Sequence, residues 1–209
     1  MTGWLPDYLW RQGEFQSGVA VFVNSSGQIT GLSSDAADLA RAERLAGRAM
    51  LPGLVNTHSH AFQRAIRGRT ERRGGNGYDT FWTWREAMYQ VANKLSPEAL
   101  YHVARMAFLE MLFGGITSVG EFYYLHRDPG GDGYPDRNAL AMQTIRAAED
   151  TGLRIALLRA AYTRAGWNQP ADPAQARFIT ARAEHFMTET EALARQCSGG
   201  GSWVGVATA

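Results

Sequence analysis

The sequence predicts an α/β fold in which part of a small β-sandwich domain precedes the N-terminal half of a (β/α)8 barrel. Three observations predict it. Short strand patterns fill residues 1–49. Over residues 50–209, apolar strand-like runs alternate with helix-like segments, and repeated βα units form parallel sheets with right-handed crossovers. A complete eightfold barrel takes about 250 residues, so the pattern covers only the first four βα units.

The composition is that of an ordinary globular domain. The 209 residues have a net charge of +1, with 45% hydrophobic and 20% charged residues, so nothing points to nucleic acid or an anionic membrane as the main partner. The single cysteine, Cys197, excludes an internal disulfide. The N-terminus does not resemble a signal peptide, and no apolar run approaches the roughly 20 residues that cross a bilayer. We therefore expect a cytoplasmic protein.

Residues 1–49 contain one clear hairpin. Val19–Val23 and Gln28–Leu32 predict two strands joined by the turn Asn24–Gly27. The alanine-rich stretch Asp35–Arg48 predicts a helical turn. Because a two-stranded hairpin is not stable by itself, this part of the chain must pack on other elements.

The first barrel strand ends in two histidines. The apolar run Leu51–Val55 predicts a buried strand, and His58 and His60 follow it one residue apart. Side chains at i and i+2 of a strand leave on the same face, so the two imidazoles lie side by side and can hold one ion of zinc, iron, copper or nickel. Such pairs also arise by chance. Their position at a strand end, where a parallel barrel keeps its chemistry, favours a metal site.

A polar segment and an aromatic helix follow. The glycine-rich stretch Arg69–Asp79 matches neither phosphate-binding pattern and is either a mobile loop at the mouth of a site or a plain surface loop. A helix is expected from Phe81 to about Leu95. Its two tryptophans beside Arg85 are either core packing with a surface charge or an aromatic wall with a bidentate anion-binding fork.

The next helix has clear ends. Ser96 is suited to the N-cap and Pro97 to the first helical position. Apolar residues then recur at i, i+3 and i+4 until Gly114, which ends the helix. His102 lies off the apolar stripe, so we interpret it as a solvated helix residue.

Three more strands complete the predicted half-barrel. The second strand carries Glu121, Tyr123 and Tyr124 at its end, followed by His126. The expected later elements are a helix over 138–150, a strand over 154–162 covered on both faces, a helix from Asp172-Pro173 to about Cys197 that contains a surface His185, and a strand over 203–207.

Four segments together resemble a known family. The stretch from Leu51 to Ala65 is similar to the first strand of the amidohydrolase superfamily. With Phe81–Tyr89, Glu121–Tyr124 and Gln175–Phe178 it resembles the formimidoylglutamate deiminases of histidine degradation. The two histidines alone indicate the superfamily, whereas their combination with the Phe-Trp-Thr-Trp-Arg segment is more specific. The resemblance spans nearly the whole chain.

The resemblance implies a metal-dependent barrel that binds one Zn²⁺ and hydrolyses N-formimino-L-glutamate to N-formyl-L-glutamate and ammonia. His58 and His60 match metal ligands, Gln63 a residue placed at the formimino group, and Arg85 and Tyr124 residues that hold the substrate carboxylates. A dianionic substrate needs such donors, and zinc lowers the pKa of its bound water to about 7. The family also suggests a homodimer at full length.

One departure from the family is large. Its members are roughly twice as long, and their third metal histidine, acid/base glutamate, second catalytic histidine and metal aspartate lie on later strands. The sequence therefore gives no catalytic residue here, and the remaining zinc ligands are absent although such sites use at least three protein ligands. We expect an N-terminal fragment that is inactive alone.

Two alternatives stay open. The first is another amidohydrolase deaminase acting on a nucleobase or a triazine-like amidine, which would have no use for a carboxylate-binding Arg85. The second is a non-catalytic interaction module or decayed gene product, whose open sheet edges favour pairing with another chain or aggregation.

Overall fold

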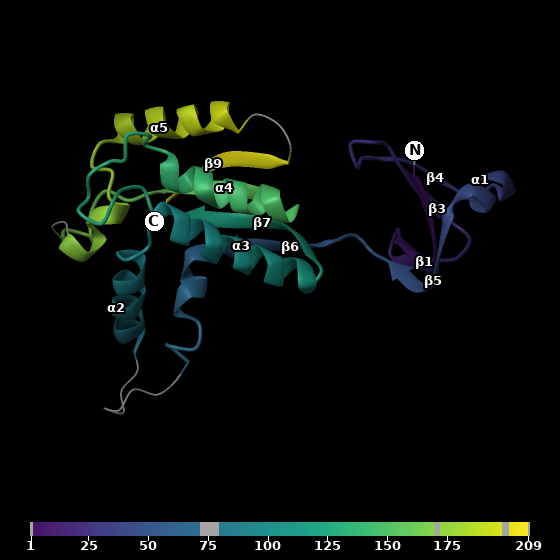
Figure 1. Cartoon of the computed structure of the whole chain (residues 1–209), viewed down its shortest axis with the longest axis horizontal. Coiled ribbons are helices and arrows are strands. Elements are labelled where there is room, and N and C mark those ends of the chain that lie inside the picture. Colours follow the sequence, from purple (N-terminus) through teal and green to yellow (C-terminus); the bar gives the residue numbers. More distant parts are fainter. Residues whose placement is uncertain (1, 72–79, 170–171, 198–200, 209) are drawn as a thin grey trace. The chain divides into compact units, whose positions relative to one another are not determined.

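The computed structural model describes residues 2–71, 80–169, 172–197 and 201–208. The chain divides into two compact units, Met1–Gly53 and Leu54–Ala209 (Figure 1). Most of the predicted loop Arg69–Asp79 lies outside the described residues. Within the described ranges, no helix is both long enough and apolar enough to cross a membrane.

The first unit is a five-stranded sheet. Its strands follow the order β2-β1-β3-β4, and β5 pairs in parallel with β1. The predicted hairpin is confirmed as β3 and β4, which are antiparallel with Val21 opposite Leu32. The bounds are β1 Thr2–Arg11, β2 Glu14–Gln16, β3 Ala20–Val23, β4 Ile29–Ser33, α1 Ala36–Arg41 and β5 Glu43–Met50.

Three strands of this sheet were not expected from the sequence. β1 contains Pro6 and Asp7, which are poor strand formers, and its pairing with β5 shifts register between Pro6 and Tyr8. β1 is nevertheless central, because it pairs with β2, β3 and β5. Pairing with three partners therefore outweighs its local propensity.

The second unit is a parallel sheet with its strands in sequence order, β6-β7-β8-β9, as in the wall of a barrel. The expected α/β fold with the first four barrel strands is confirmed. The strands are β6 Leu54–Ser59, β7 Ile116–Tyr123, β8 Arg154–Ala161 and β9 Ser202–Thr208. The helices are η1 Ala61–Ile66, α2 Phe81–Ala92, α3 Pro97–Phe113, α4 Ala139–Thr151, η2 Pro173–Phe178 and α5 Ala183–Gln196, where η marks a 3₁₀ helix.

The predicted helix ends are confirmed for α3 and α4. The Ser96 hydroxyl accepts a hydrogen bond from the Ala99 amide, Pro97 opens α3, and Gly114 caps its C-terminus. Gly152 ends α4 with φ of 79°, a left-handed conformation that glycine adopts without strain. α3 and α4 pack beside each other along the sheet (Figure 1).

Two predictions for this unit are wrong. Leu54 and Val55 are 60% and 63% exposed rather than buried, because β6 is the edge strand of the described sheet and pairs only with β7 there. Leu51, which precedes the strand, is also exposed, at 55%. The helix expected over 172–197 is broken into η2 and α5. At the break, the Thr180 amide donates to the Tyr162 carbonyl at 2.8 Å instead of to a carbonyl one turn earlier in a helix.

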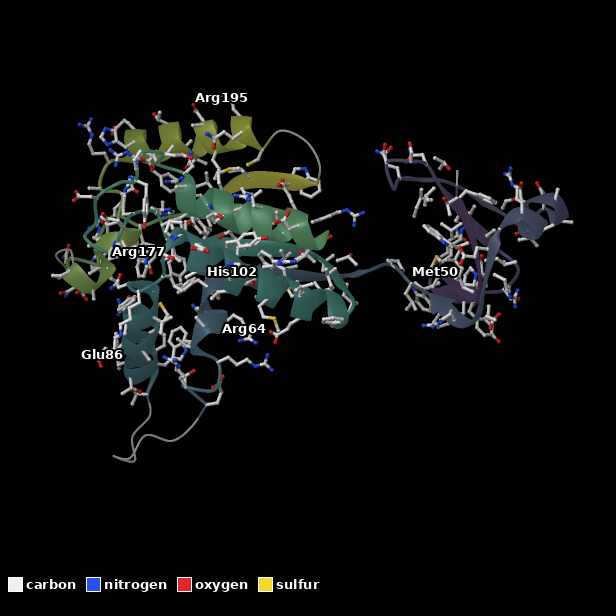
Figure 2. All side chains as sticks on the ribbon, in the orientation of Figure 1. Met50, Arg64, Glu86, His102, Arg177 and Arg195 are labelled. Atoms are coloured by element: carbon white, nitrogen blue, oxygen red, sulfur yellow. The ribbon has the colours of Figure 1, made fainter. Side chains whose placement is uncertain are left out.

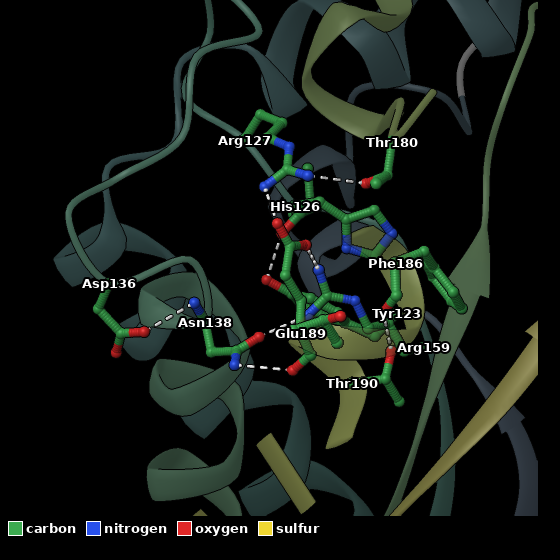
Figure 3. A network of polar contacts seen from close by, with 12 residues as sticks. Tyr123, His126, Arg127, Asp136, Asn138, Arg159, Thr180, Phe186, Glu189 and Thr190 are labelled. Atoms are coloured by element: carbon green, nitrogen blue, oxygen red, sulfur yellow. Dashed lines mark hydrogen bonds and ion pairs between the residues drawn. The ribbon is translucent and has the colours of Figure 1, made fainter. Parts of the chain in front are cut away.

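A buried network of ion pairs and hydrogen bonds joins α5 and β8 to the segments that follow β7 and precede α4 (Figure 3). Glu189 of α5 accepts from Arg127, which follows β7, at 2.8 Å and from Arg159 of β8 at 2.5 Å. Asn138 before α4 accepts from Arg159 and donates to the Glu189 carbonyl. Both arginines are buried, so this single carboxylate compensates two cations that have little water around them.

Candidate functional site

The two histidines meet at the C-terminal end of β6. His58 lies inside the strand, and His60 lies just beyond it at the N-cap position of η1. Their Nε2 atoms are 3.1 Å apart. The Nδ1 atom of His60 lies 2.8 Å from the carbonyl oxygen of Phe122. Because a carbonyl can only accept, Nδ1 carries the proton and Nε2 presents a lone pair.

This geometry fits a pair of metal ligands. Two nitrogens bound to one tetrahedral zinc at 2.0–2.1 Å are about 3.3 Å apart, close to the separation seen here. Burial, together with the charge of His58, lowers the pKa of His60 and favours the neutral form that ligates metals. Among the described residues no group of three or more His, Cys, Asp or Glu side chains is placed to hold a metal. The pair therefore offers two nitrogens, fewer than the three or more protein ligands that a zinc site uses.

Phe122 of β7 supports the pair, a role that the sequence analysis missed. Its ring stacks on His58 with centroids 4.2 Å apart, and its carbonyl fixes the tautomer of His60. The sequence pattern indicated only that Phe122 lies on the opposite face of β7 from Glu121 and Tyr123, which are buried. Nothing in the sequence specified which ring would meet the histidine.

Glu121 holds the chain just after the pair. Its Oε1 accepts a hydrogen bond of 2.6 Å from the amide of Ala61, the residue that follows His60. Burial raises the pKa of this carboxyl to about 7, against the opposing effect of the Ala61 amide. Glu121 therefore anchors the strand end that carries His60.

Gln63 and Tyr124 join the histidine pair directly. The Gln63 amide donates to the Tyr124 hydroxyl at 3.0 Å. The Tyr124 ring meets His60 edge to face, with centroids 5.1 Å apart. Burial raises the pKa of Tyr124, so its hydroxyl keeps its proton. Four of the residues predicted for the site, His58, His60, Gln63 and Tyr124, thus form one contiguous group.

Arg85 reaches this group only through other aromatic rings. Its guanidinium lies over Trp82 and over Tyr89, 5.4 and 5.2 Å from the ring centroids, and its Nε donates to the Tyr89 hydroxyl at 2.5 Å. Tyr89 and Tyr124 both pack on Phe178, at 5.4 and 5.3 Å. Within the described residues no direct contact joins Arg85 to Tyr124. Because Trp82 is 66% exposed, the aromatic-wall interpretation fits it better than core packing.

The cavity that borders His60 is lined by none of the other residues predicted for the site. This cavity of about 320 Å³ is lined in part by His60, Arg64 and Glu110, where Arg64 makes a two-pronged ion pair with Glu110 at 2.9 Å. Larger cavities of about 460 and 530 Å³ both border Arg127 and His185. We place the site at His60, because the convergent nitrogen donors are there and the larger cavities have no such group.

The other histidines have different environments. His102 is exposed on α3, as expected (Figure 2), and His185 is exposed on α5. His126 is buried, and its Nε2 donates to the Ala160 carbonyl at 2.9 Å. Burial, followed by the charge of Arg159, lowers its pKa to about 3. His126 is thus a neutral core residue.

Acidification should therefore destabilise the fold through His126. Between pH 6.5 and about 3 the unfolded chain takes up a proton that the folded chain refuses, so stability falls as pH falls, by about 1.4 kcal/mol per unit. Urea unfolding at pH 4 to 7 should show a flatter pH dependence for His126→Asn than for the wild type. Glu121 contributes the opposite slope between pH 4.5 and 7, and it cancels in the comparison. Equal slopes in the two proteins would contradict the assignment, and His102→Ala is the control.

The comparisons with known proteins agree with this geometry. The family model "Amidohydrolase family" matches residues 49–208, and the chain belongs to that family. Within it, the chain is 48% identical over 139 residues to formimidoylglutamate deiminase from Pseudomonas aeruginosa, an alignment that covers 66% of this chain and 30% of the relative. It is 28% identical over 144 residues to 8-oxoguanine deaminase from the same organism, covering 69% and 29%.

Solved structures show the same fold. An amidohydrolase from Brucella melitensis superposes with a TM-score of 0.85 at 30% identity, covering all of this chain and 46% of its own. A zinc complex of atrazine chlorohydrolase from Arthrobacter aurescens gives 0.74 at 21% identity with the same coverage. The chain thus spans less than half the length of these proteins and about a third of the curated relatives.

Proposed function

We propose that the whole protein containing this chain is a zinc-dependent hydrolase that converts N-formimino-L-glutamate to N-formyl-L-glutamate and ammonia. The observation that carries the proposal is the 3.1 Å approach of the Nε2 atoms of His58 and His60, with Gln63 and Tyr124 beside them. The 48% identity to a formimidoylglutamate deiminase supports the substrate.

The residues of this chain divide the work by their chemistry. His58 and His60 would hold the metal, which when bound supplies Lewis acidity and an ionised water at neutral pH. Gln63 offers an amide to the polar formimino group, and its bond to Tyr124 orients it. Arg85 offers a two-pronged donor to a substrate carboxylate, for which a guanidinium is well shaped. Proton transfer falls to groups beyond this chain, so we propose that the 209 residues alone are inactive.

A second candidate is a deaminase of nucleobases or nucleosides. It is favoured by the 28% identity to 8-oxoguanine deaminase and by the 26% identity to 5-methylthioadenosine/S-adenosylhomocysteine deaminase from Halalkalibacterium halodurans. A nucleobase or a simple nucleoside gives Arg85 no carboxylate to bind, although S-adenosylhomocysteine carries one. Formiminoglutamate and neutral purines such as guanine and adenosine therefore separate the two candidates.

The test is an assay of the complete barrel, in which these 209 residues are joined to the remainder from the natural gene or from the Pseudomonas aeruginosa relative. We expect zinc-dependent ammonia release from formiminoglutamate and much slower release from guanine or adenosine. Turnover of a purine with none of formiminoglutamate would replace the proposal by the second candidate. The expected homodimer and cytoplasmic location stay predictions.

Arg85 gives a sharper prediction in the same assay. Arg85→Leu should raise KM for formiminoglutamate at least tenfold, because a charge-assisted bidentate contact of about 1.5–3 kcal/mol is lost. Turnover of an N-alkylformamidine without carboxylates should change little. Arg105→Leu, an exposed arginine of α3, is the control. An unchanged KM for formiminoglutamate would remove Arg85 from the substrate site.

A further inference from the structure

The environment of Arg85 contains two polar residues that have no role in the function proposed above. Tyr89 is buried on α2 one turn after Arg85, and Gln175 is buried in η2. The Tyr89 hydroxyl oxygen accepts from Arg85 Nε at 2.5 Å and from Gln175 Nε2 at 2.6 Å. Gln175 thus acts on the Nε atom of Arg85 through the Tyr89 hydroxyl, although η2 and α2 are far apart in the sequence.

This arrangement fixes three features of Arg85. The Trp82 and Tyr89 rings contact its guanidinium, the Tyr89 hydroxyl holds Nε, and within the described residues neither Nη atom has a hydrogen-bond partner. A guanidinium held by Nε is oriented, and its two terminal nitrogens form the edge that matches a carboxylate. The donors are arranged before a ligand arrives, which reduces the entropy lost on binding.

Burying the polar side chain of Gln175 costs free energy, so its presence in the interior calls for an explanation. It is fully buried, and within the described residues its Oε1 has no hydrogen-bond partner. An apolar side chain of similar size would fill the space without an unpaired oxygen, and unpaired buried polar groups in native proteins call for an explanation. The bond to Tyr89 supplies one, because it fixes the hydroxyl that holds Arg85.

We propose that Tyr89 and Gln175 are positioning residues that hold the Arg85 guanidinium ready for a carboxylate of the substrate. The inference rests on the proposed function for the identity of the ligand. Neither residue needs to touch the substrate, since both act through Arg85. Phe178, the last residue of η2, packs on Tyr89 and keeps η2 against α2.

The test uses the complete barrel described above and two measurements. The first is the hydrogen exchange rate of Arg85 Nε–H by ¹⁵N NMR, with the signal assigned by its loss in Arg85→Lys. Tyr89→Phe keeps the ring but removes the hydroxyl, and exchange should accelerate about tenfold, the size expected for a lost hydrogen bond to a charged group. Gln175→Met should accelerate it about threefold. Tyr101→Phe removes a hydroxyl bonded to Asp150 elsewhere on the chain and should change nothing.

The second measurement is the affinity for glutarate, a dicarboxylate probe. We expect glutarate to shift the Arg85 Nε–H signal, Arg85→Lys to abolish binding, and both positioning variants to weaken it about fivefold while their thermal unfolding stays cooperative. A role in packing alone would alter the unfolding temperature but not the exchange at Nε. If Tyr89→Phe does not fold, Gln175→Met carries the test.

The outcomes distinguish a failure of this inference from a failure of the proposed function. If Arg85→Lys abolishes glutarate binding but the positioning variants match the wild type in exchange and affinity, the inference is overturned and the proposed function stands. If the wild type shows no Arg85-dependent binding, the carboxylate role within the proposed function is overturned, and the inference falls with it.

Discussion

Replacing Glu189 by leucine will lower the free energy of unfolding by about 3–5 kcal/mol. This carboxylate is the shared partner of Arg127 and Arg159, whose side chains are only 9% and 1% exposed (Figure 3). Without it, two cations stay in the interior with no negative charge beside them. The cost of an uncompensated buried charge exceeds what the leucine side chain regains by packing. Urea unfolding at pH 7 measures the change.

A glutamate on the same helix provides the matched control. Glu191 pairs with Arg195 at 3.9 Å, and both side chains are more than half exposed. Glu191→Leu should change the unfolding free energy by less than about 1 kcal/mol, because exposed ion pairs contribute little. Similar losses in the two variants would mean that the network around Glu189 is solvated in solution.

Removing His60 will lower turnover in the complete barrel by more than about 100-fold. Mutating a residue that supports a metal ligand typically lowers metal affinity or activity about 10–100-fold. Losing a ligand itself should lower activity by more than about 100-fold. His60→Ala removes one of the two convergent Nε2 atoms and its contact with Tyr124. Initial rates with formiminoglutamate and excess zinc measure the effect. His102→Ala, on the exposed face of α3, should keep wild-type rates, and activity of His60→Ala within tenfold of wild type would contradict the assignment.

The sequence was most informative where local chemistry determines structure. The Ser96-Pro97 start and Gly114 end of α3 follow from capping, and the approach of His58 to His60 follows from the two-residue repeat of a strand. These features need only neighbours in the chain. The same holds for the βα alternation that predicted the parallel sheet.

Long-range interactions account for most of what was missed. Arg177 is fully buried, and it donates to the carbonyls of Arg127, Ala92 and Leu95, so it joins η2 to the end of α2 (Figure 2). A sequence pattern places an arginine at the surface, because charged side chains are rarely buried. Acceptors that lie 50 or more residues away leave no local trace.

Long-range contacts also explain why the sequence alone could not predict which site residues meet. Gln63 and Tyr124 are 61 positions apart, and Tyr89 and Gln175 are 86 apart. Resemblance to a family selected Gln63, Arg85 and Tyr124, but no spacing rule connects them. The resemblance included the segments that contain Tyr89 and Gln175, but the contacts of these residues with Arg85 became visible only when the fold brought α2 and η2 together.

The most direct test of this account is zinc binding by the complete barrel, measured by competition titration. We expect one zinc equivalent whose affinity falls at least tenfold in His58→Ala/His60→Ala, while His102→Ala/His185→Ala behaves like the wild type. Equal stoichiometry and affinity in all three proteins would mean that zinc binds elsewhere, and the pair at the end of β6 would then not be a metal site.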